Sequence, residues 1–558
     1  MTATYRDAIP FLRRTVFSVI FAGIATAGAQ NEKGIPVTDP LVIAKCGTCH
    51  PPDESGNLSR ISWVRTTPEG WQNTIKRMVT VHGLTVTPSE ARLVVRDLSA
   101  NHGLAPEEVR PVMYEAERRI HEEPSTSTDA LRMACAKCHS FAKVLLWRRS
   151  ANEWAQFAAS HAVDRQYPPD EETSGLLAKA APLHTQEGDA WIARPRIPHL
   201  TGRWLVTASL PGRGGYYGEM QVERAGEDFT TRVNLTSLRD GSQMVRTGRA
   251  AVFGGYAWRG RSQGSASLSS APDDLSSEVR EVLWIAPDES MAEGRWFWGQ
   301  YQEFGFDVKL QRASSNPRLL LLNPLFLKTG SHGNRIRIIG DQFPAAFTAS
   351  DLAFGPGVTV RSIVSRAPGE IVVEADVAAD AQLGKRDVAF RGSVLPGALA
   401  LYDRVDYVKV IPESAVAAFG DKKYPRGYQQ FEAIGYQRGR DGQARTADDV
   451  ELGPVDVSWS MNVFHAPEGS SAGHVGGVDQ TGLFTPASDN PNNNFDVWIT
   501  ATARDQKNAK GKPLVGKSYL VVTIPSYTFN GREYVRELGR WIDNGPTMSP
   551  APARPGQR

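Results

Sequence analysis

The feature that most constrains this chain is a five-residue motif, Cys-x-x-Cys-His, that occurs twice. It stands at residues 46–50 and again at residues 135–139, and the two copies use all 4 cysteines of the 558-residue chain. Two thiols with this spacing can add to the two vinyl groups of one porphyrin, and the adjoining histidine then lies under the iron as its fifth ligand. Each copy therefore predicts one covalently bound haem c.

The residues predicted to attach the two haems are Cys46, Cys49, His50, Cys135, Cys138 and His139. A structural zinc site or a thioredoxin-like redox pair can also contain a Cys-x-x-Cys spacing. Neither explains a histidine after both pairs, and a zinc site would have to join sequences roughly 90 residues apart. Haem attachment is the better interpretation.

An internal repeat extends beyond the cysteines and predicts the sixth ligands of the iron atoms. In each half an arginine precedes a tryptophan by the same interval, and these residues are Arg65, Trp71, Arg148 and Trp154. Continuing this register past each tryptophan reaches Met78 in the first half and His161 in the second. Because both side chains can ligate haem iron, the repeat predicts a His50/Met78 haem and a His139/His161 haem.

Each predicted sixth ligand has competitors. A methionine on an apolar helix face is ordinarily a core residue, and His82, one helical turn after Met78, is a rival ligand for the first haem. No methionine is available to the second haem in this stretch, so His161 competes with His184 and with an open sixth position. His161 could also be a core histidine. Met78 and His161 are the preferred assignments.

The first 29 residues have the pattern of a removable export signal. Two arginines precede an apolar run at 16–25, and Ala-Gly-Ala at 27–29 forms a cleavage site. The run is too short to cross a bilayer, and no other stretch approaches that length, so we expect secretion into a bacterial periplasm and no membrane span. With every cysteine occupied by haem, no disulfide is expected.

Composition limits the class of partner and the number of domains. Lys and Arg number 63 against 61 Asp and Glu, so no field suited to nucleic acid is expected. The length favours about four domains. Hydrophobic patterning predicts a fold class in which an all-α tandem dihaem cytochrome c domain is followed by three all-β domains, an antiparallel barrel and two immunoglobulin-like sandwiches. The predicted boundaries are 1–29 for the signal peptide, 30–195 for the dihaem domain, 196–315 for the barrel, 316–406 and 407–545 for the sandwiches, and 546–558 for a disordered tail.

Local patterns refine this division. Thr87 to Glu90 form a capping box that opens a helix, and residues 105–108 open a second helical segment expected to run to Ile120. In the β domains, the aromatic stretch 295–301 favours core filling, and the acidic stretch 441–451 favours a polar turn over a calcium loop because its spacing is incomplete. Three histidines have no convincing partners in sequence, and these are His332, His465 and His474. We expect the β domains to be structural.

Taken together, the chain resembles the alpha subunit of bacterial quinohaemoprotein amine dehydrogenase over nearly its whole length. The residues that carry the resemblance lie at 46–50, 71–83, 135–140 and 203–217. The resemblance implies an enzyme of three different subunits that oxidises primary amines to aldehyde and ammonia. It also implies that the cofactor cysteine tryptophylquinone belongs to a small gamma subunit, that the beta subunit is a β-propeller, and that this chain holds no amine-oxidising residues. Electrons would pass to a periplasmic cytochrome or cupredoxin.

Two other functions compete with this one. A dihaem cytochrome c peroxidase also pairs two haems, but it needs an open sixth position and carries no long β-sandwich tail. A haem-bearing sensory or adhesion module would use the β domains for binding. Peroxide turnover by the isolated chain would favour the first, and purification without any partner would favour the second.

Overall fold

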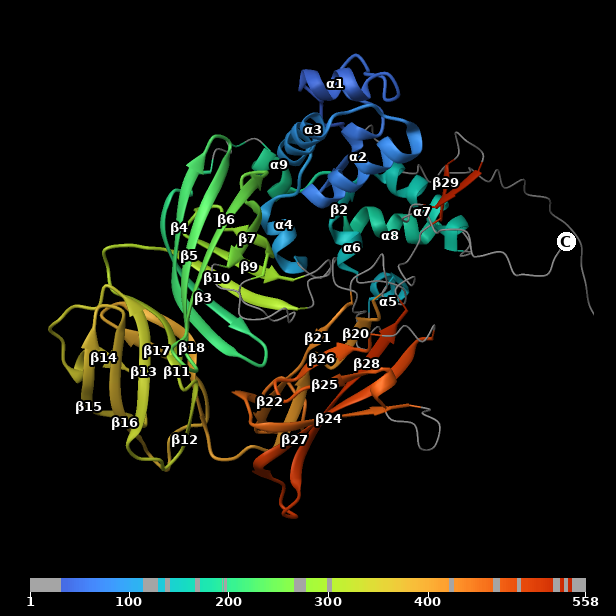
Figure 1. Ribbon diagram of the computed structural model, residues 1–558. Helices are drawn as coiled ribbons and strands as arrows, with labels where there is room; N and C mark the ends of the chain where they lie inside the picture. Colours follow the sequence, from blue (N-terminus) through green and yellow to red (C-terminus); the bar gives the residue numbers. More distant parts are fainter. Residues whose placement is uncertain are drawn as a thin grey trace, which may run out of the picture. The chain divides into compact units, whose positions relative to one another are not determined.

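The computed structural model is dominated by strands (Figure 1). It describes residues 32–113, 129–135, 141–165, 171–192, 194, 198–264, 277–298, 304–420, 426–464, 472–488, 493–524, 532–535 and 540–543. Of these residues, 46% lie in strands and 21% in helices. The described residues from Ile35 onward belong to one compact unit. The predicted signal peptide and C-terminal tail lie outside the described residues.

The N-terminal region contains short helices and two very short strands. The helices are α1 (Pro40–Cys46), α2 (Pro68–His82), α3 (Pro88–Asn101), α4 (Pro106–Val109), α5 (Ala130–Cys135), α6 (Ala142–Leu145), α7 (Ala151–Arg165), α8 (Glu171–Ala180) and α9 (Gln186–Ile192). The strands are β1 (Val64–Thr66) and β2 (Trp147–Arg149). The described residues contain no helix long and apolar enough to cross a membrane.

Local sequence signals explain where several helices begin and end. The predicted capping box of α3 is confirmed, because the Thr87 hydroxyl accepts from the Glu90 backbone and the Glu90 carboxylate accepts from the Thr87 backbone. The prediction of one continuous helical segment after residue 105 is wrong. Helix α4 ends at Val109 and a short 3-10 turn follows, because Pro111 lacks the N–H that an α-helix would need there. Residues 114–120 lie outside the described residues.

The predicted fold class is wrong for this region, which is neither all-α nor a pair of separate cytochrome domains in tandem. Strands β1 and β2 pair antiparallel and join the two halves, with Val64 opposite Arg149 and Arg65 opposite Arg148. Each strand has only three residues, too few to show a period-2 hydrophobic pattern in the sequence. The two residues that the repeat makes equivalent are therefore direct cross-strand neighbours, as at a local two-fold axis.

A buried ion cluster holds this junction. Arg65 is fully buried and forms a bidentate pair with Glu108, with Nη1 to Oε2 at 2.8 Å and Nη2 to Oε1 at 3.0 Å. Arg148 Nε also donates to Glu108 Oε1, at 3.2 Å. Burial alone would raise the pKa of Glu108, but the hydrogen bonds and charge of Arg65 and the charge of Arg148 outweigh it and lower the pKa. One carboxylate thus pairs with an arginine from each half.

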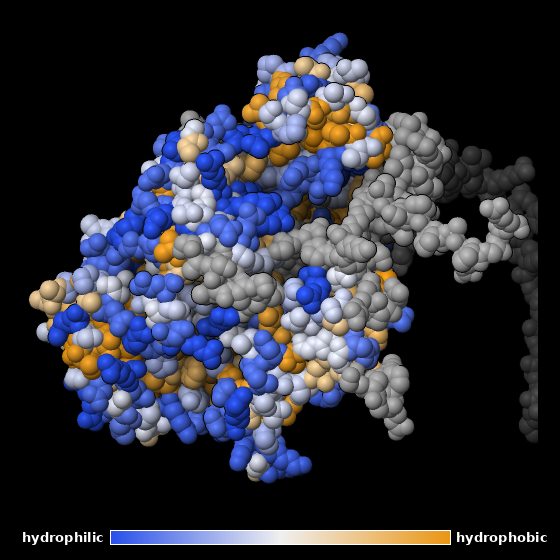
Figure 2. Space-filling model, in the orientation of Figure 1, coloured by the Kyte–Doolittle hydropathy of each residue, from blue (hydrophilic) through white to orange (hydrophobic). Residues whose placement is uncertain are grey.

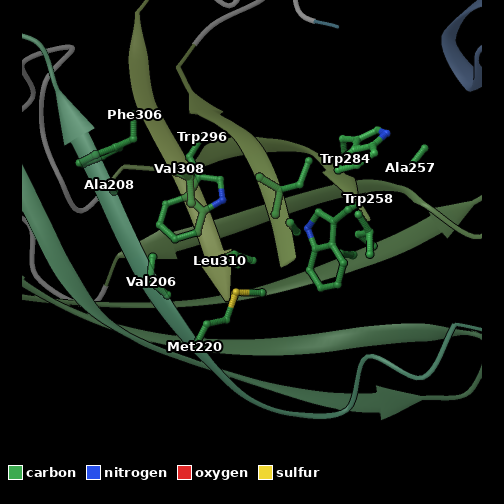
Figure 3. Close-up of a cluster of buried hydrophobic side chains, with 14 of the residues drawn as sticks. Val206, Ala208, Met220, Ala257, Trp258, Trp284, Trp296, Phe306, Val308 and Leu310 are labelled. Carbon is green, nitrogen blue, oxygen red and sulfur yellow. The ribbon is translucent and has the colours of Figure 1, made fainter. Parts of the chain in front are cut away.

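The second region is a closed barrel in which each strand pairs antiparallel with its neighbours in sequence, and β10 closes on β3. Its strands are β3 (Gly202–Leu210), β4 (Gly214–Ala225), β5 (Asp228–Ser237), β6 (Gln243–Phe253), β7 (Ala257–Gly264), β8 (Val279–Ile285), β9 (Met291–Phe297) and β10 (Gly305–Arg312). Its interior is packed with apolar and aromatic side chains, and Figure 3 shows Val206, Met220, Trp258, Trp296 and Leu310 gathered between the strands. Trp296 is fully buried, so this part of the aromatic stretch fills the core.

The third region is a sandwich of two four-stranded sheets around one apolar core. One sheet has the order β11-β13-β16-β15 and the other β12-β18-β17-β14. The strands are β11 (Arg318–Asn323), β12 (Phe326–Lys328), β13 (Asn334–Asp341), β14 (Leu352–Ala353), β15 (Val358–Ala367), β16 (Glu370–Val377), β17 (Gly384–Phe390) and β18 (Ser393–Tyr402). His332, which has no evident partner in sequence, lies 3.2 Å from the Asp376 carboxylate.

The fourth region is more complex than the predicted two-sheet sandwich. Its described strands form three sheets of three or four strands, with the orders β19-β22-β23, β20-β28-β27-β24 and β21-β26-β25. Strands β29 and β30 form a separate two-stranded pair. The strands are β19 (Tyr407–Ile411), β20 (Ser414–Ala418), β21 (Gln429–Gln430), β22 (Glu432–Gln437), β23 (Val450–Pro454), β24 (Val457–Val463), β25 (Gly476–Val478), β26 (Leu483–Pro486), β27 (Phe495–Lys507), β28 (Pro513–Thr523), β29 (Arg532–Val535) and β30 (Arg540–Asp543). His465, one of the three histidines without a convincing partner in sequence, lies outside the described residues.

Removing the shared carboxylate should destabilise the junction strongly. Glu108→Gln leaves two buried arginines without their anion, which should lower the free energy of unfolding by about 3–5 kcal/mol. Glu107→Gln is the matched control, since Glu107 is exposed and its loss should change stability by less than about 0.5 kcal/mol. Denaturant unfolding of both variants measures the difference, and equal stabilities would show that the cluster does not hold the halves together.

Candidate haem-binding site

The first motif lies at the C-terminal end of α1. The chain continues in helical turns after Cys46, with Gly47 N donating to Ile43 O at 2.8 Å and His50 N donating to Cys46 O at 2.8 Å. A Cβ at Gly47 would lie 2.6 Å from the Ile43 carbonyl oxygen, so this close turn requires glycine. Cys46 is buried, Cys49 is exposed, and the two form no disulfide with each other. Burial, with a smaller effect of Cys49, raises the pKa of the Cys46 thiol.

The surroundings of His50 favour a neutral imidazole, which is the form that binds iron. Burial lowers the pKa of His50, and the positive charges of Arg60, His82 and Arg77 lower it further, against a hydrogen bond with the Ser59 backbone. The structure therefore brings the rival ligand His82 into the electrostatic environment of His50. A neutral ring can offer its lone pair without first losing a proton.

Helix α2, which carries Met78, packs against the first motif. Cys46 packs in one apolar cluster with Trp71 and Ile75 of α2, and Met78, which is half-buried, follows Ile75 by three residues on the same helix face. His82 is exposed at the end of this helix, one turn further on. Both candidates lie on a helix that packs against Cys46, so Met78 stays the preferred assignment and His82 stays its rival.

Helix α7 has the same relation to the second motif. Cys135 packs against a cluster that contains Trp154 and is also contacted by Ala158, and His161 follows Ala158 by three residues. His161 is exposed, and its ring stacks on Phe157 with centroids 5.3 Å apart and planes 18° apart. Cys138 and His139 lie outside the described residues.

The repeat found in the sequence is a structural one. Helices α2 and α7 each have 15 residues. The indole of Trp71 donates to the carbonyl of His102 at 3.0 Å, and the indole of Trp154 donates to the carbonyl of Ala181 at 2.7 Å. Both acceptors follow the next long helix of their half. Each tryptophan therefore ties the helix that carries the candidate sixth ligand to the helix after it.

The second rival, His184, lies just before α9. Its Nδ1 is 2.8 Å from the Asp189 carboxylate. Ligating histidines commonly donate their other ring nitrogen to a carboxylate in this way, because the pair fixes the tautomer and the ring orientation. His184 therefore stays an alternative sixth ligand for the second haem.

Exposed apolar side chains around the motifs fit a bound porphyrin. Ile43 of α1 is 40% exposed, Val79 of α2 is 40% exposed and Leu93 of α3 is 49% exposed. Figure 2 shows hydrophobic surface over this region, at the top of the view. In the second half Phe157, beside His161, is 36% exposed. Burying such side chains against a large apolar ring is favourable by about 25 cal/mol per Å².

Sequence reasoning missed the buried polar residues that hold the two halves. The sequence around Glu108 predicts only a helix start, and the repeated arginines indicate only a register. Buried His102 was also missed. Its Nε2 lies 3.0 Å from the Ile35 carbonyl, and its own carbonyl accepts from Thr66 N at 3.1 Å as well as from the Trp71 indole. An unexplained arginine at equivalent positions of both repeats was the available signal.

The acidic stretch of the fourth region has the contacts of a polar turn. Asp449 accepts from the Tyr407 hydroxyl at 2.5 Å and from the backbone of Arg445 at 2.6 Å, and Asp448 accepts from the Thr446 hydroxyl at 2.9 Å. Over the described part of the chain, no group of three or more His, Cys, Asp or Glu side chains is placed to hold a metal ion.

Comparison with protein families gives one consistent result for all four regions. The family model described as the haem-binding region of the quinohemoprotein amine dehydrogenase alpha subunit matches residues 37–176. The models for domains II, III and IV of the same subunit match residues 198–313, 316–403 and 408–534. The chain is therefore a haem-binding component of an oxidoreductase. It belongs to the quinohaemoprotein amine dehydrogenase alpha-subunit family, as the sequence predicted, and an alpha subunit implies partner subunits.

Other comparisons add little. Curated protein sequences gave no significant match. Among solved structures, a redesigned β-barrel bound to the ligand DFHBI is 15% identical, with a TM-score of 0.18, and the match covers 21% of this chain and all of that one. A de novo designed fluorescence-activating β-barrel is 17% identical, with a TM-score of 0.17, over 22% of this chain and all of that one.

Acid should destabilise the helical region, because buried His102 must stay neutral. Burial and the nearby charge of Arg65 lower the pKa of His102 to about 4, against the hydrogen bond with Ile35. The unfolded chain binds this proton near pH 6.5. The stability that depends on neutral His102 is therefore complete above pH 6.5 and lost as the pH falls to 4, at about 1.4 kcal/mol per pH unit or about 3 kcal/mol in all.

Denaturant unfolding between pH 7 and pH 4 measures this loss. The variant His102→Gln should have a shallower fall in stability over the same range, whereas His199→Gln, at an exposed position, should retain the wild-type profile. If His102→Gln and wild type lose the same free energy between pH 6.5 and pH 4, the buried imidazole is not responsible.

Proposed function

We propose that this chain is the electron-transfer subunit of a periplasmic primary-amine dehydrogenase and carries two covalently bound haems c. Electrons from a cysteine tryptophylquinone cofactor on a small gamma subunit would pass through these haems to a soluble cytochrome or cupredoxin. A β-propeller beta subunit completes the proposed heterotrimer. The observation that carries the proposal is the structural repeat, in which Cys46 and Cys135 pack against equivalent helices that each present a candidate iron ligand.

The residues of this chain have separate roles in the proposal. Cys46, Cys49, Cys135 and Cys138 hold the haems through thioether bonds, and His50 and His139 are the proximal ligands, with Met78 and His161 as the preferred sixth ligands. Bound haem supplies reversible one-electron storage at each site. A thioether favours ferrous iron more than a second imidazole does, so the His50/Met78 site has the higher potential. The second motif is then the entry for electrons and the first motif the exit.

Export supports the periplasmic assignment. The N-terminal 29 residues have the sequence pattern of a signal peptide, and attachment of haem to Cys-x-x-Cys-His normally follows export of an unfolded chain. Amine oxidation is assigned to the partner subunit. This chain contributes the acceptor sites, and its β domains contribute a frame on which the partners dock.

Affinity capture of the tagged chain from native periplasm tests the proposal most simply. We expect a small chain with a quinone redox stain and a second, propeller-sized chain to be recovered with it. Recovery of this chain alone would contradict the proposed assembly. Peroxide turnover by the isolated chain would favour a dihaem peroxidase instead.

The mature chain should contain two haems that acid acetone does not extract. Intact mass under denaturing conditions should exceed the mass of the polypeptide by two haem groups. Replacing Cys46 and Cys49 together by alanine should remove one of them and leave the other, because each motif holds its own haem. A single haem in the wild-type chain, or haem lost to acid acetone, would show that covalent dihaem attachment is wrong.

Replacing Met78 by histidine should lower the midpoint potential of one haem only. A fall of about 100 mV would oppose a one-electron step toward the acceptor by about 2.3 kcal/mol. His82→Gln is the control, because removal of a non-ligand should leave that potential unchanged. Potentiometric titration of both variants decides between the two residues. A shift with His82→Gln and none with Met78→His would make His82 the ligand.

A further inference from the structure

The side chain of Arg149, the last residue of β2, is held among three aromatic rings. Its guanidinium carbon lies 4.6 Å from the centroid of the Trp147 ring, 5.4 Å from that of Trp154 and 5.3 Å from that of Phe157. Trp154 and Phe157 also contact each other edge to face, with centroids 5.5 Å apart. Each ring presents its negative face to a cation at such a distance, so the site favours a retained positive charge.

This cation lies between the two haem units and beside a predicted ligand. Trp147 packs against the apolar cluster that contains Cys46 and also against the cluster that includes Cys135. Phe157 contacts Arg149 on one side, and its ring stacks on His161 at 5.3 Å. A single aromatic ring, that of Phe157, therefore contacts both the guanidinium and the side chain assigned as sixth ligand of the second haem.

The neighbouring charges leave this cation only partly balanced. The negative charge of the Glu153 carboxylate stabilises the charged form of Arg149. The same carboxylate also lies 3.7 Å from the Arg60 guanidinium. Arg60 and Arg77 add positive charge on the same group. Burial lowers the pKa of Arg149 to about 10, so the side chain is still charged at neutral pH.

The charge belongs to the second half alone. In the alignment of the two repeats, Arg65 corresponds to Arg148. The next residue of each repeat then gives Thr66 as the counterpart of Arg149. Thr66 is neutral, and its hydroxyl donates to the Leu146 carbonyl at 2.7 Å. The repeat is otherwise followed closely in this stretch, since α2 and α7 have the same length and both carry the bonded tryptophan.

We propose that Arg149 raises the reduction potential of the second haem by placing a fixed positive charge beside His161. This inference rests on the proposed function, in which His139 and His161 hold that haem. Reduction removes one positive charge from the iron, so a nearby cation stabilises the reduced state. Arg149 is half-buried against aromatic rings, so the effect of its charge is screened less than that of a fully exposed arginine. Electrons from the partner subunit then enter the second site more readily.

Potentiometric titration of the haem-loaded full chain tests the charge. Arg149→Met should lower the midpoint potential of the second haem by at least 59 mV, which is a tenfold change in a one-electron reduction equilibrium, and should lower that of the first haem by less. Arg149→Lys should recover most of the wild-type value. Glu153→Gln removes the opposing anion and should shift the same midpoint upward.

A matched control comes from the third region. Arg366 lies over the Phe347 ring at 5.0 Å, and Arg366→Met should move neither midpoint. An unchanged second midpoint in an Arg149→Met protein that retains two haems would overturn the inference and leave the proposed function intact. If Arg149→Met fails to fold, a Glu153→Gln midpoint that stays or falls overturns it equally. A wild-type chain with one haem by mass would overturn the proposed function itself.

Discussion

The cross-strand contact between Arg65 and Arg148 is the interaction on which the haem-binding region depends. Two like charges opposite each other on paired strands repel, and Glu108 offsets this repulsion by accepting hydrogen bonds from both arginines. The carboxylate also accepts from the Ala105 backbone at 2.7 Å, so the connection after α3 is fixed at the same point. Two repeats that could have been separate domains thereby share one polar core.

From that junction each repeat extends in the same way. The strand leads into a long helix, α2 or α7, whose tryptophan is bonded to a later carbonyl and whose next turns carry Met78 or His161. The scaffold is thus duplicated, while the groups that face the proposed iron sites differ. The first half carries the thioether of Met78. The second half carries the imidazole of His161, and Phe157 contacts both this imidazole and the guanidinium of Arg149. Differences in these few side chains can give two similar sites unequal potentials.

The sequence was sufficient for what short-range spacing encodes. The Thr87 capping box, which the structure confirms, depends on residues close together in the chain. The Cys-x-x-Cys-His motifs and the register that relates Met78 to His161 are read from local spacing in the same way, and the ligand roles taken from them stay predictions. The β1–β2 pairing could not be predicted, because three-residue strands have no readable period and their partners are separated by the whole first repeat. The role of Glu108 was hidden for the same reason. Its sequence context indicates only a helix start, and its burial depends on contacts with Arg65 and Arg148 that form only in the folded chain.

Reduction of the native complex by substrate tests the central claim most directly. The purified assembly would be mixed anaerobically with a primary amine, and the absorbance of each haem followed in time. The account predicts that both haems become reduced, the haem of the second motif before that of the first. Both haems staying oxidised while the quinone is reduced, or the first-motif haem being reduced first, would contradict it.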